Sequence, residues 1–340
     1  MITFRQQSPS SLGVVRQSEL SASCRDSFSD EYDLLSEIGR GRFARVCQVR
    51  HKRSGETFAA KIIRRWRNGK DTIETLMREL DIIERGKLSR RIVSMNEYYV
   101  RATDFVIILE HACGGDLYSM THYFEINPSV AFVKSAVQQS LEALDFLHER
   151  SIVHLDVKPD NILLRQPYPD CDIILCDFGL SKFLSQEKVT RDLVGTPDYA
   201  APEILDYNPI HLTTDIWSIG VLTYYLLTGT SPFWAPTKEQ TCANVSQLLL
   251  SFPDDLFLDI PQAAVRFIQR ILVKNPNDRP SASQCLLDPW FSDIEEEEQP
   301  EPPVPTCATD CVTQAADDTK DSPITYEPVC SELDRSYGEC

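Results

Sequence analysis

Near the middle of the 340-residue chain runs the stretch His154-Leu155-Asp156-Val157-Lys158-Pro159-Asp160-Asn161, which is followed later by Asp177-Phe178-Gly179. An acid, an amine and an amide stand in fixed register, and a second acid comes 21 positions after the first. This set suits metal-assisted phosphoryl transfer. Asp156 would orient a hydroxyl, Lys158 would neutralise a migrating phosphoryl group, and Asn161 and Asp177 would hold metal ions. Alone, the stretch also fits a turn between a helix and a strand, so the interpretation depends on the rest of the chain.

The segments around this stretch predict a helical half of the protein. Asn127-Pro128-Ser129 is a helix start signal, and apolar residues recur after it at helical spacing. Residues 172–176 indicate a short strand that ends at Asp177. The apolar run 216–227 is too short to span a bilayer and predicts a buried helix, at whose start Asp215 needs a partner in the core.

The segment that begins at Tyr32 predicts strands around a glycine-rich turn. Apolar residues flank the run Ile38-Gly39-Arg40-Gly41-Arg42-Phe43-Ala44-Arg45-Val46. Glycines let a backbone approach phosphate oxygens, although any hairpin uses them, and Ala44 replaces a third glycine. Lys61 lies in the next predicted strand, Thr57 to Ile63, where a lone amine either faces negative charge or reaches solvent.

A basic loop and a helix follow this strand. The loop from Arg64 to Lys70 would be solvated or would dock an acidic partner. Asp71-Thr72-Ile73-Glu74 is typical of a capping pair that opens a helix. Glu79 lies beside the apolar stripe of this helix, where it would either pair with Lys61 or remain on the surface. Further segments follow in order: strands at 92–100 and 105–109, and a connector from Glu110 to Asp116.

The two ends of the chain differ from its middle in composition. Residues 1–31 hold eight serines, and we expect a disordered Ser-rich leader. From Asp293 onward there are 14 acidic and 2 basic residues, a net charge of −12, so the preceding 292 residues carry −5 of the total of −17. We expect residues 292–340 to be an acidic, Pro-rich, disordered tail. Whether this tail contacts the basic loop is left open.

Cysteine content and charge narrow the compartment and the partners. The chain has eleven cysteines, an odd number without regular spacing, and no apolar signal segment near Met1. These features predict a reducing, intracellular environment. The acidic charge disfavours nucleic acid as a partner, no transmembrane segment is predicted, and the oligomeric state is not determined by the sequence.

Taken in order, the motifs resemble those of eukaryotic protein kinases. The resemblance covers residues 32–291, about 260 of 340. Lys158-Pro159 resembles serine/threonine kinases rather than tyrosine kinases. More narrowly, His154-Leu155-Asp156, the basic loop and residues 217–223 resemble the death-associated protein kinase family, above all its DRAK branch, which lacks a calmodulin segment. The matching motifs are the Gly-rich turn, Ala59-Ala60-Lys61, Glu79, His154 to Asn161, Asp177-Phe178-Gly179, Ala201-Pro202-Glu203, Asp215-Ile216-Trp217 and Arg279.

The resemblance implies a fold and an activity. The fold is α+β and bilobal, with a small β-rich N-lobe of about 32–110 that contains one key helix, and a larger, mainly helical C-lobe of about 114–291. The activity is ATP- and Mg²⁺-dependent transfer of the γ-phosphate to Ser/Thr hydroxyls of proteins, in apoptosis signalling and in the nucleus or cytoplasm. A second hypothesis is a pseudokinase-type scaffold or binding module. It is disfavoured because such proteins usually lose the charge set that is complete here.

The resemblance also implies roles for single residues. Asp156 would be the catalytic base, Lys158 would contact the γ-phosphate, and Asn161 and Asp177 would hold Mg²⁺. Leu109 would be the gatekeeper of the adenine pocket. Glu203 and Arg279 would form a structural ion pair, and Asp215 would brace the catalytic loop. Twelve residues would form the nucleotide site, either by contacting ATP or by positioning a residue that does: Ile38, Gly39, Arg40, Gly41, Val46, Ala59, Lys61, Glu79, Glu110, Ala112, Asp116 and Leu163.

Substrate preference and calmodulin control are further expectations. Asp116 and Asp160 stand where related kinases place acids that face basic residues upstream of the acceptor, which predicts a preference for basic sequences. The alternative is that Asp116 chiefly binds the ribose and Asp160 is solvated. The segment after Phe291 is rich in Glu and Pro instead of forming a basic amphipathic helix, so calmodulin binding is not expected.

Leu155 replaces the arginine that most protein kinases use to grip a phosphate on the activation loop. An apolar side chain cannot pair with phosphate, so this electrostatic switch is missing. We hypothesise that the site is assembled without phosphorylation at Ser185, Thr190 or Thr196.

Overall fold

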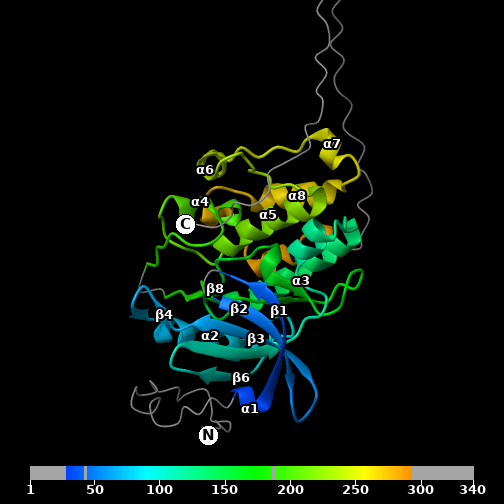
Figure 1. The fold of residues 1–340 in the computed structure, drawn as a ribbon. Coiled ribbons are helices and arrows are strands. Elements are labelled where there is room, and N and C mark those ends of the chain that lie inside the picture. Colours follow the sequence, from blue (N-terminus) through cyan, green and yellow to red (C-terminus); the bar gives the residue numbers. More distant parts are fainter. Residues whose placement is uncertain (1–27, 42–43, 186–188, 293–340) are drawn as a thin grey trace, which may run out of the picture. The chain divides into compact units, whose positions relative to one another are not determined.

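The structure is a computed structural model that describes residues 28–41, 44–185 and 189–292 (Figure 1). Its strands are β1 (Tyr32–Arg40), β2 (Ala44–His51), β3 (Thr57–Arg64), β4 (Trp66–Arg67), β5 (Lys70–Asp71), β6 (Met95–Val100), β7 (Asp104–Glu110), β8 (Ile152–Val153), β9 (Ile162–Leu164), β10 (Ile173–Leu175) and β11 (Lys182–Phe183). Its α-helices are α1 (Phe28–Glu31), α2 (Ile73–Gly86), α3 (Val130–His148), α4 (Pro202–Leu205), α5 (Thr214–Thr228), α6 (Lys238–Gln247), α7 (Asp254–Phe257), α8 (Gln262–Ile271) and α9 (Ala282–Cys285). A π-helical turn covers Ser119–Tyr123, and 3₁₀ turns cover Pro159–Asn161, Pro197–Tyr199, Pro276–Asp278 and Pro289–Phe291.

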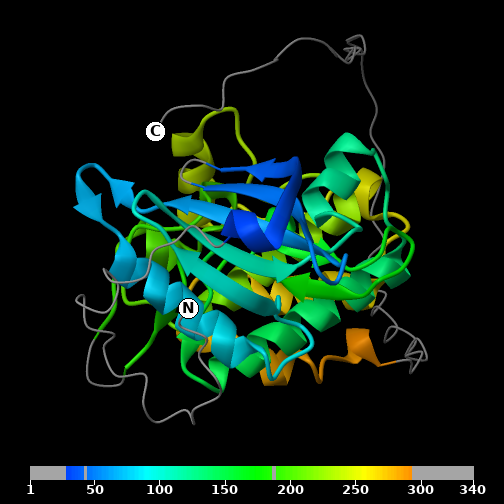
Figure 2. The ribbon, with the colours of Figure 1, turned by 60° about the horizontal axis from the view of Figure 1, so that its bottom comes forward.

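The small lobe is an antiparallel five-stranded sheet in the order β1-β2-β3-β7-β6, with α2 alongside it (Figure 2). Successive side chains of a strand point to opposite faces of the sheet. On β3, Ala60 and Ile62 therefore pack with Tyr32 on one face, while Ile63 packs with the buried residues of α2 on the other. Lys61 shares the face of Ile63, which directs its amine toward α2.

The large lobe is built on α3 and α5, which pack against each other (Figure 1). α3 starts as predicted, because the Ser129 hydroxyl accepts a hydrogen bond from the Phe132 N–H at 3.2 Å. The predicted stripe of α3 is buried, and the helix also contacts α9 and β10. None of the helices in the described residues combines the length and the apolar character needed to cross a membrane.

Three local predictions were wrong in detail. The basic loop is a hairpin of β4 and β5, because the Arg65 guanidinium closes it with bonds of 2.7 to 3.1 Å to the Asp71 carboxylate. At the predicted start of α2, the Asp71 carboxylate accepts the Ile73 N–H at 3.1 Å, whereas the Thr72 hydroxyl donates to the Arg65 carbonyl at 2.7 Å and does not cap the helix. The strand predicted at 92–100 begins only at Met95, since Ile92 and its neighbours pair with β10 of the large lobe.

The predicted leader and tail lie largely outside the described residues. At their inner boundary, Phe28 to Glu31 form α1 and belong to the folded part. The Phe28 side chain is buried and stacks on Tyr32 with a ring-centroid distance of 5.8 Å. The described structure therefore includes four residues of the predicted leader.

The ion pair expected between Glu203 of α4 and Arg279 is present and lies inside the large lobe. Two parallel bonds of 2.7 Å join the guanidinium to the carboxylate, and both side chains are almost fully buried. The remaining N–H groups of Arg279 reach the carbonyls of Thr213, Val273 and Lys274 at 2.7 to 3.2 Å. A buried charge with every donor satisfied tolerates no loss of its partner.

Arg279→Ala should lower the free energy of unfolding by about 3–5 kcal/mol, because it leaves the Glu203 carboxylate buried and uncompensated. Thermal and denaturant unfolding of the full chain would measure this. The matched control is Arg85→Ala, which removes an exposed pair with Asp81 and should leave stability nearly unchanged. Equal effects of the two substitutions would contradict a structural role for the Glu203–Arg279 pair.

Candidate active site

Residues 154–161, which we call the catalytic loop, are held in place by Asp215, the second residue of α5. This carboxylate is fully buried and accepts hydrogen bonds from the main-chain N–H groups of His154 and Leu155, each at 2.8 Å. A third contact, of 2.9 Å, joins it to Nε2 of His148 at the end of α3. The brace implied by the resemblance is thus formed, and it holds Leu155 in a left-handed conformation with φ of 68°.

Asp156 lies at the centre of a cluster of polar side chains, which includes Lys158 and Asn161. The Asn161 amide donates to the Asp156 carboxylate at 2.9 Å and to its main-chain oxygen at 2.8 Å. The Lys158 ammonium is 3.1 Å from the same carboxylate. Asn161 fixes the orientation of the Asp156 carboxylate, and Lys158 lies beside it. A carboxylate and an ammonium group therefore lie next to each other at this position.

Thr196 belongs to this cluster as well, although sequence reasoning treated it only as a candidate phosphorylation site. Its hydroxyl donates to Asp156 at 3.0 Å and accepts from Lys158 at 2.8 Å. The neighbouring Gly195 has a φ of 93°, and a β-carbon there would lie 2.9 Å from the Leu155 carbonyl. Gly195 therefore allows the close approach, and the Gly-Thr-Pro sequence was the signal that could have identified Thr196.

The Lys61 ammonium bridges two carboxylates, one from each lobe. It lies 2.7 Å from Glu79 of α2 and 2.8 Å from Asp177 after β10. Burial would lower the pKa of Lys61, but the two carboxylates outweigh it and hold that pKa above its usual value. The Lys61 charge in turn lowers the pKa of Asp177 to about 2. Lys61 and Asp177 are therefore ionised at neutral pH. Glu79 is buried rather than on the surface.

Strand register aligns the residues expected around a nucleotide. Gly39 pairs with Val46, and Val46 pairs with Lys61, so these three lie in one row across β1, β2 and β3. Ala59 pairs with Leu109 at the start of the connector between the lobes. Leu163 of β9 is bridged to Asp116 on the opposite side of that connector. The connector, residues 110–116, therefore runs between the sheet and β9.

Four of the residues expected to bind the nucleotide do not join the polar clusters around Asp156 and Lys61. The Arg40 guanidinium is exposed and pairs with Glu37 at 2.6 Å. The Asp116 carboxylate accepts bonds from the main-chain N–H and the hydroxyl of Ser119, at 2.7 and 2.8 Å. Ile38 lies in β1, and Gly41 follows that strand and donates to the Ala44 carbonyl at 2.8 Å. These positions offer main-chain or apolar surface rather than free charge.

Comparison with known proteins gives a consistent answer. The family model described as the protein kinase domain matches residues 32–291. Serine/threonine-protein kinase 17A from Oryctolagus cuniculus is 41% identical over 271 residues, which cover 78% of this chain and 68% of the relative. Death-associated protein kinase related from Drosophila melanogaster is 40% identical over 275 residues, 81% of this chain and 40% of the relative. Death-associated protein kinase 2 from Homo sapiens is 35% identical over 274 residues, 79% and 74% of the two chains.

The family match runs from the start of β1 to Phe291 and includes the catalytic loop. These comparisons agree with the bilobal architecture and with the complete set of charged residues around Asp156 and Lys61. The pseudokinase alternative is not favoured by them. The chain belongs to the protein kinase family and is a serine/threonine protein kinase of the death-associated protein kinase group, near its DRAK branch.

Proposed function

We propose that this kinase transfers the γ-phosphoryl group of ATP to Ser/Thr hydroxyls with Asp156 as the base and Lys158 at the γ-phosphate. The observation that carries the proposal is the Asp156 carboxylate, held by Asn161 and Thr196 beside the Lys158 ammonium. Phosphoryl transfer needs positioning and charge neutralisation rather than covalent chemistry. A substrate hydroxyl would donate to Asp156, whose direction the protein has already set.

The donors of Asn161 and Asp177 fit a magnesium site. The Asn161 nitrogen is committed to Asp156, which leaves its amide oxygen as a ligand. Asp177 stays ionised because of its lowered pKa. Mg²⁺ usually binds one or two protein carboxylates together with phosphate oxygens and water, and Asp177 with the Asn161 amide oxygen would fit that pattern. Bound Mg²⁺ would neutralise charge on the phosphate oxygens.

Lys61 would bind the α- and β-phosphates of the nucleotide. Its ammonium is directed by Glu79 and Asp177, so its position does not depend on the nucleotide. Gly39, Arg40 and Gly41 would offer main-chain groups to the phosphates. The apolar side chains of Ile38, Val46, Ala59 and Leu163 would enclose the adenine, with Glu110 and Ala112 presenting main-chain groups to its edge.

Asp156→Asn should lower kcat for phosphate transfer to a basic protein substrate by a factor of about 10² to 10⁴, the usual contribution of a general base. The KM for ATP should change little, because the nucleotide contacts remain. A radiolabelled ATP assay with Mg²⁺ measures both constants, with the exposed Asp206→Asn as control. Incorporation that survives Asp156→Asn unchanged would refute the role of this residue, and an inactive wild-type chain would favour the scaffold alternative.

We also propose a preference for basic residues upstream of the acceptor. Asp160 supports it, since this exposed carboxylate follows Pro159 at the edge of the catalytic loop. Asp116 supports it less, because Ser119 already occupies its carboxylate. Carboxylates recognise Arg and Lys through charge-assisted hydrogen bonds.

Asp160→Asn should lower kcat/KM about tenfold for a peptide with Arg upstream of the acceptor, the loss expected for one charge-assisted hydrogen bond. A matched peptide with Ala in place of Arg should be phosphorylated equally by both enzymes. Positional peptide arrays provide the first measurement. An acidic or proline-directed preference of the wild-type enzyme would overturn the proposal.

Activity without activation-loop phosphorylation is a third proposal for this site. Leu155 is buried and lines a small cavity together with Val194 and Ile204, and its apolar side chain has no group that could pair with a phosphate. Two other contacts hold the segment that carries Thr190 and Asp192. Lys182 forms an ion pair with Asp192, and the Thr190 carbonyl accepts from the Ile210 N–H at 2.9 Å. Asp192 thereby provides a fixed negative charge on the loop itself.

Phosphatase treatment should therefore leave most of the kinase activity in place. The combined substitution Ser185→Ala with Thr190→Ala should have equally little effect on kcat, whereas Thr196 is not substituted because it contacts Asp156. Mass spectrometry of the treated protein would verify that the loop is unphosphorylated. Loss of nearly all activity after treatment would contradict the proposal.

The cellular role is proposed from the relatives. Several of them are named as death-associated protein kinases or as related to these, and we extend a positive role in apoptosis signalling, in the nucleus or cytoplasm, to this chain. Control by calmodulin is not expected from the acidic sequence after Phe291, most of which lies outside the described residues. Mapping of phosphorylation sites lost on acute inhibition in cells would identify the pathway.

A further inference from the structure

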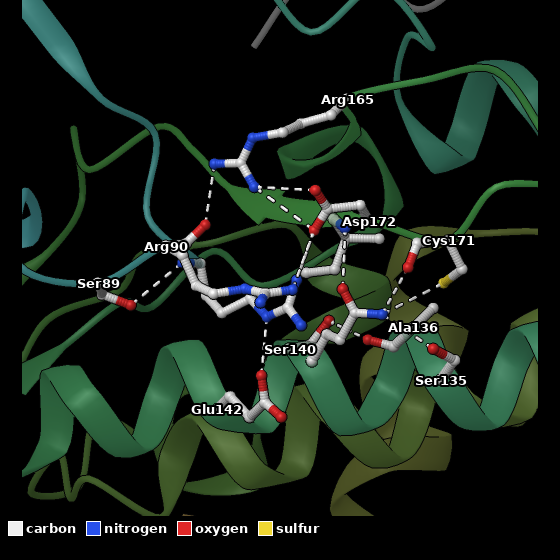
Figure 3. A network of polar contacts seen from close by, with 12 residues as sticks. Ser89, Arg90, Ser135, Ala136, Ser140, Glu142, Arg165, Cys171 and Asp172 are labelled. Atoms are coloured by element: carbon white, nitrogen blue, oxygen red, sulfur yellow. Dashed lines mark hydrogen bonds and ion pairs between the residues drawn. The ribbon is translucent and has the colours of Figure 1, made fainter.

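A network of five charged side chains joins the connector between the lobes to both of them. We call it the Arg165 network and define it as Arg91, Glu110, Glu142, Arg165 and Asp172. Figure 3 shows the part of it around Arg165, Asp172 and Glu142. Arg91 precedes β6, Glu110 ends β7, Glu142 is on α3, and Arg165 and Asp172 lie between β9 and β10. The catalytic chemistry described above uses none of these side chains.

Arg165 grips the side chain of Glu110. Its Nε lies 3.0 Å and its Nη2 lies 3.4 Å from the two carboxylate oxygens. The Glu110 carboxylate also accepts the Ser94 N–H at 2.7 Å, and the Glu110 N–H donates to the Ser94 carbonyl at 2.9 Å. Glu110 is therefore fixed through both its main chain and its side chain.

A second arginine fixes Arg165 from the other side. Asp172 is 3.4 Å from Arg165, 2.7 Å from Arg91 and 3.6 Å from Arg90, and it thus lies among three guanidinium groups. Arg91 is almost fully buried and also bonds Glu142 of α3 at 2.7 Å. Arg165 in addition donates to the Arg90 carbonyl at 2.9 Å (Figure 3). Because α3 carries one end of this network, Arg165 is anchored to the core of the large lobe.

Arg165 stands next to two walls of the proposed adenine pocket. Leu163, two residues before it, would contact one face of the base, and Glu110 would contact its edge. The main chain brings the same segments together, with Gly114 donating to the Leu164 carbonyl at 3.0 Å and Leu164 donating to Gly115 at 2.8 Å. A β-carbon on Gly114 would lie only 2.3 Å from the Gln166 carbonyl. Gly114 and Gly115 thus join the end of the connector to β9 through the main chain, and the Arg165–Glu110 pair joins the start of the connector to the same segment through side chains.

We propose that Arg165 is a positioning residue for the nucleotide, which sets the distance between the connector and β9 by clamping Glu110. The inference rests on the proposed adenine site but concerns a side chain that does not touch the nucleotide. If the clamp acts on the adenine pocket, its loss weakens nucleotide binding while the groups around Asp156 keep their geometry.

Arg165→Gln should raise the KM for ATP about tenfold and change kcat by less than about twofold, the split expected when only binding is weakened. The Kd values of ADP and ATP should rise by the same factor, because the clamp lies at the adenine end and not near Lys61. Calorimetric titration of the full chain measures both. The KM for ATP of Arg165→Lys should lie between those of the wild type and of Arg165→Gln, since lysine keeps the positive charge but loses the forked, two-point geometry of the guanidinium group.

Glu110→Gln and the double variant test whether the two side chains act together. Glu110→Gln alone should raise the KM for ATP, and adding it to Arg165→Gln should cost little more, because the pair is already broken. Arg85→Gln serves as the control, since it breaks the exposed pair with Asp81. Unfolding temperatures of all variants would show which of them remain folded.

Three results would overturn the inference: an unchanged KM in folded Arg165→Gln, an equal fall of kcat and kcat/KM, or additive effects in the double variant. A loss for ATP that is absent for ADP would also oppose it, because it would place the defect at the phosphates. Failure of the wild-type chain to bind either nucleotide would instead refute the proposed function itself, so the two failures are distinguishable.

Discussion

The active site depends on the need of one buried carboxylate for hydrogen-bond donors. Asp215 has no exposed surface, and an unpaired charge at such a position costs several kcal/mol, on the order of the total stability of a domain. The donors that satisfy it are two main-chain N–H groups of the catalytic loop and the ring of His148. Folding of the large lobe and shaping of the loop are therefore one process, and the left-handed Leu155 is held by the same bonds.

A second dependence joins the lobes through charge. Alternation along β3 sends Lys61 to the face of α2, and Glu79 and Asp177 meet it there from opposite lobes. Because Lys61 is the shared partner, displacement of α2 or of Asp177 would leave an opposite charge partly unsatisfied in a buried place. The geometry proposed for phosphate binding thus coincides with the geometry that best satisfies the charges, which is what a preorganised site requires.

Much of this arrangement could be predicted from the sequence, because periodicity and motif spacing act locally. The stripe of α3, the Ser129 cap and the strands around Gly39 and Gly41 are of this kind. Contacts made across the fold by residues without a pattern could not. Arg165 and Arg91 look like ordinary surface charges in the sequence, and Ile92 reads as part of a strand although it pairs with the large lobe. The basic loop was misjudged for the same reason, since the Arg65–Asp71 pair that closes its hairpin has no sequence signature.

The close packing of Gly114 against the 164–166 segment has a consequence for motion. Kinase lobes must separate to exchange nucleotide, and a connector usually bends where its main chain has room. Here the part from Gly114 onward is pressed on Gln166 and bonded to β9, so it moves with the large lobe as one body. Rotation of the small lobe would then have to occur in the short stretch between Glu110 and Gly114, and it would strain the Arg165–Glu110 pair. The pivot would be narrow and would lie beside the proposed adenine site, so that opening of the lobes and release of the adenine would be mechanically linked.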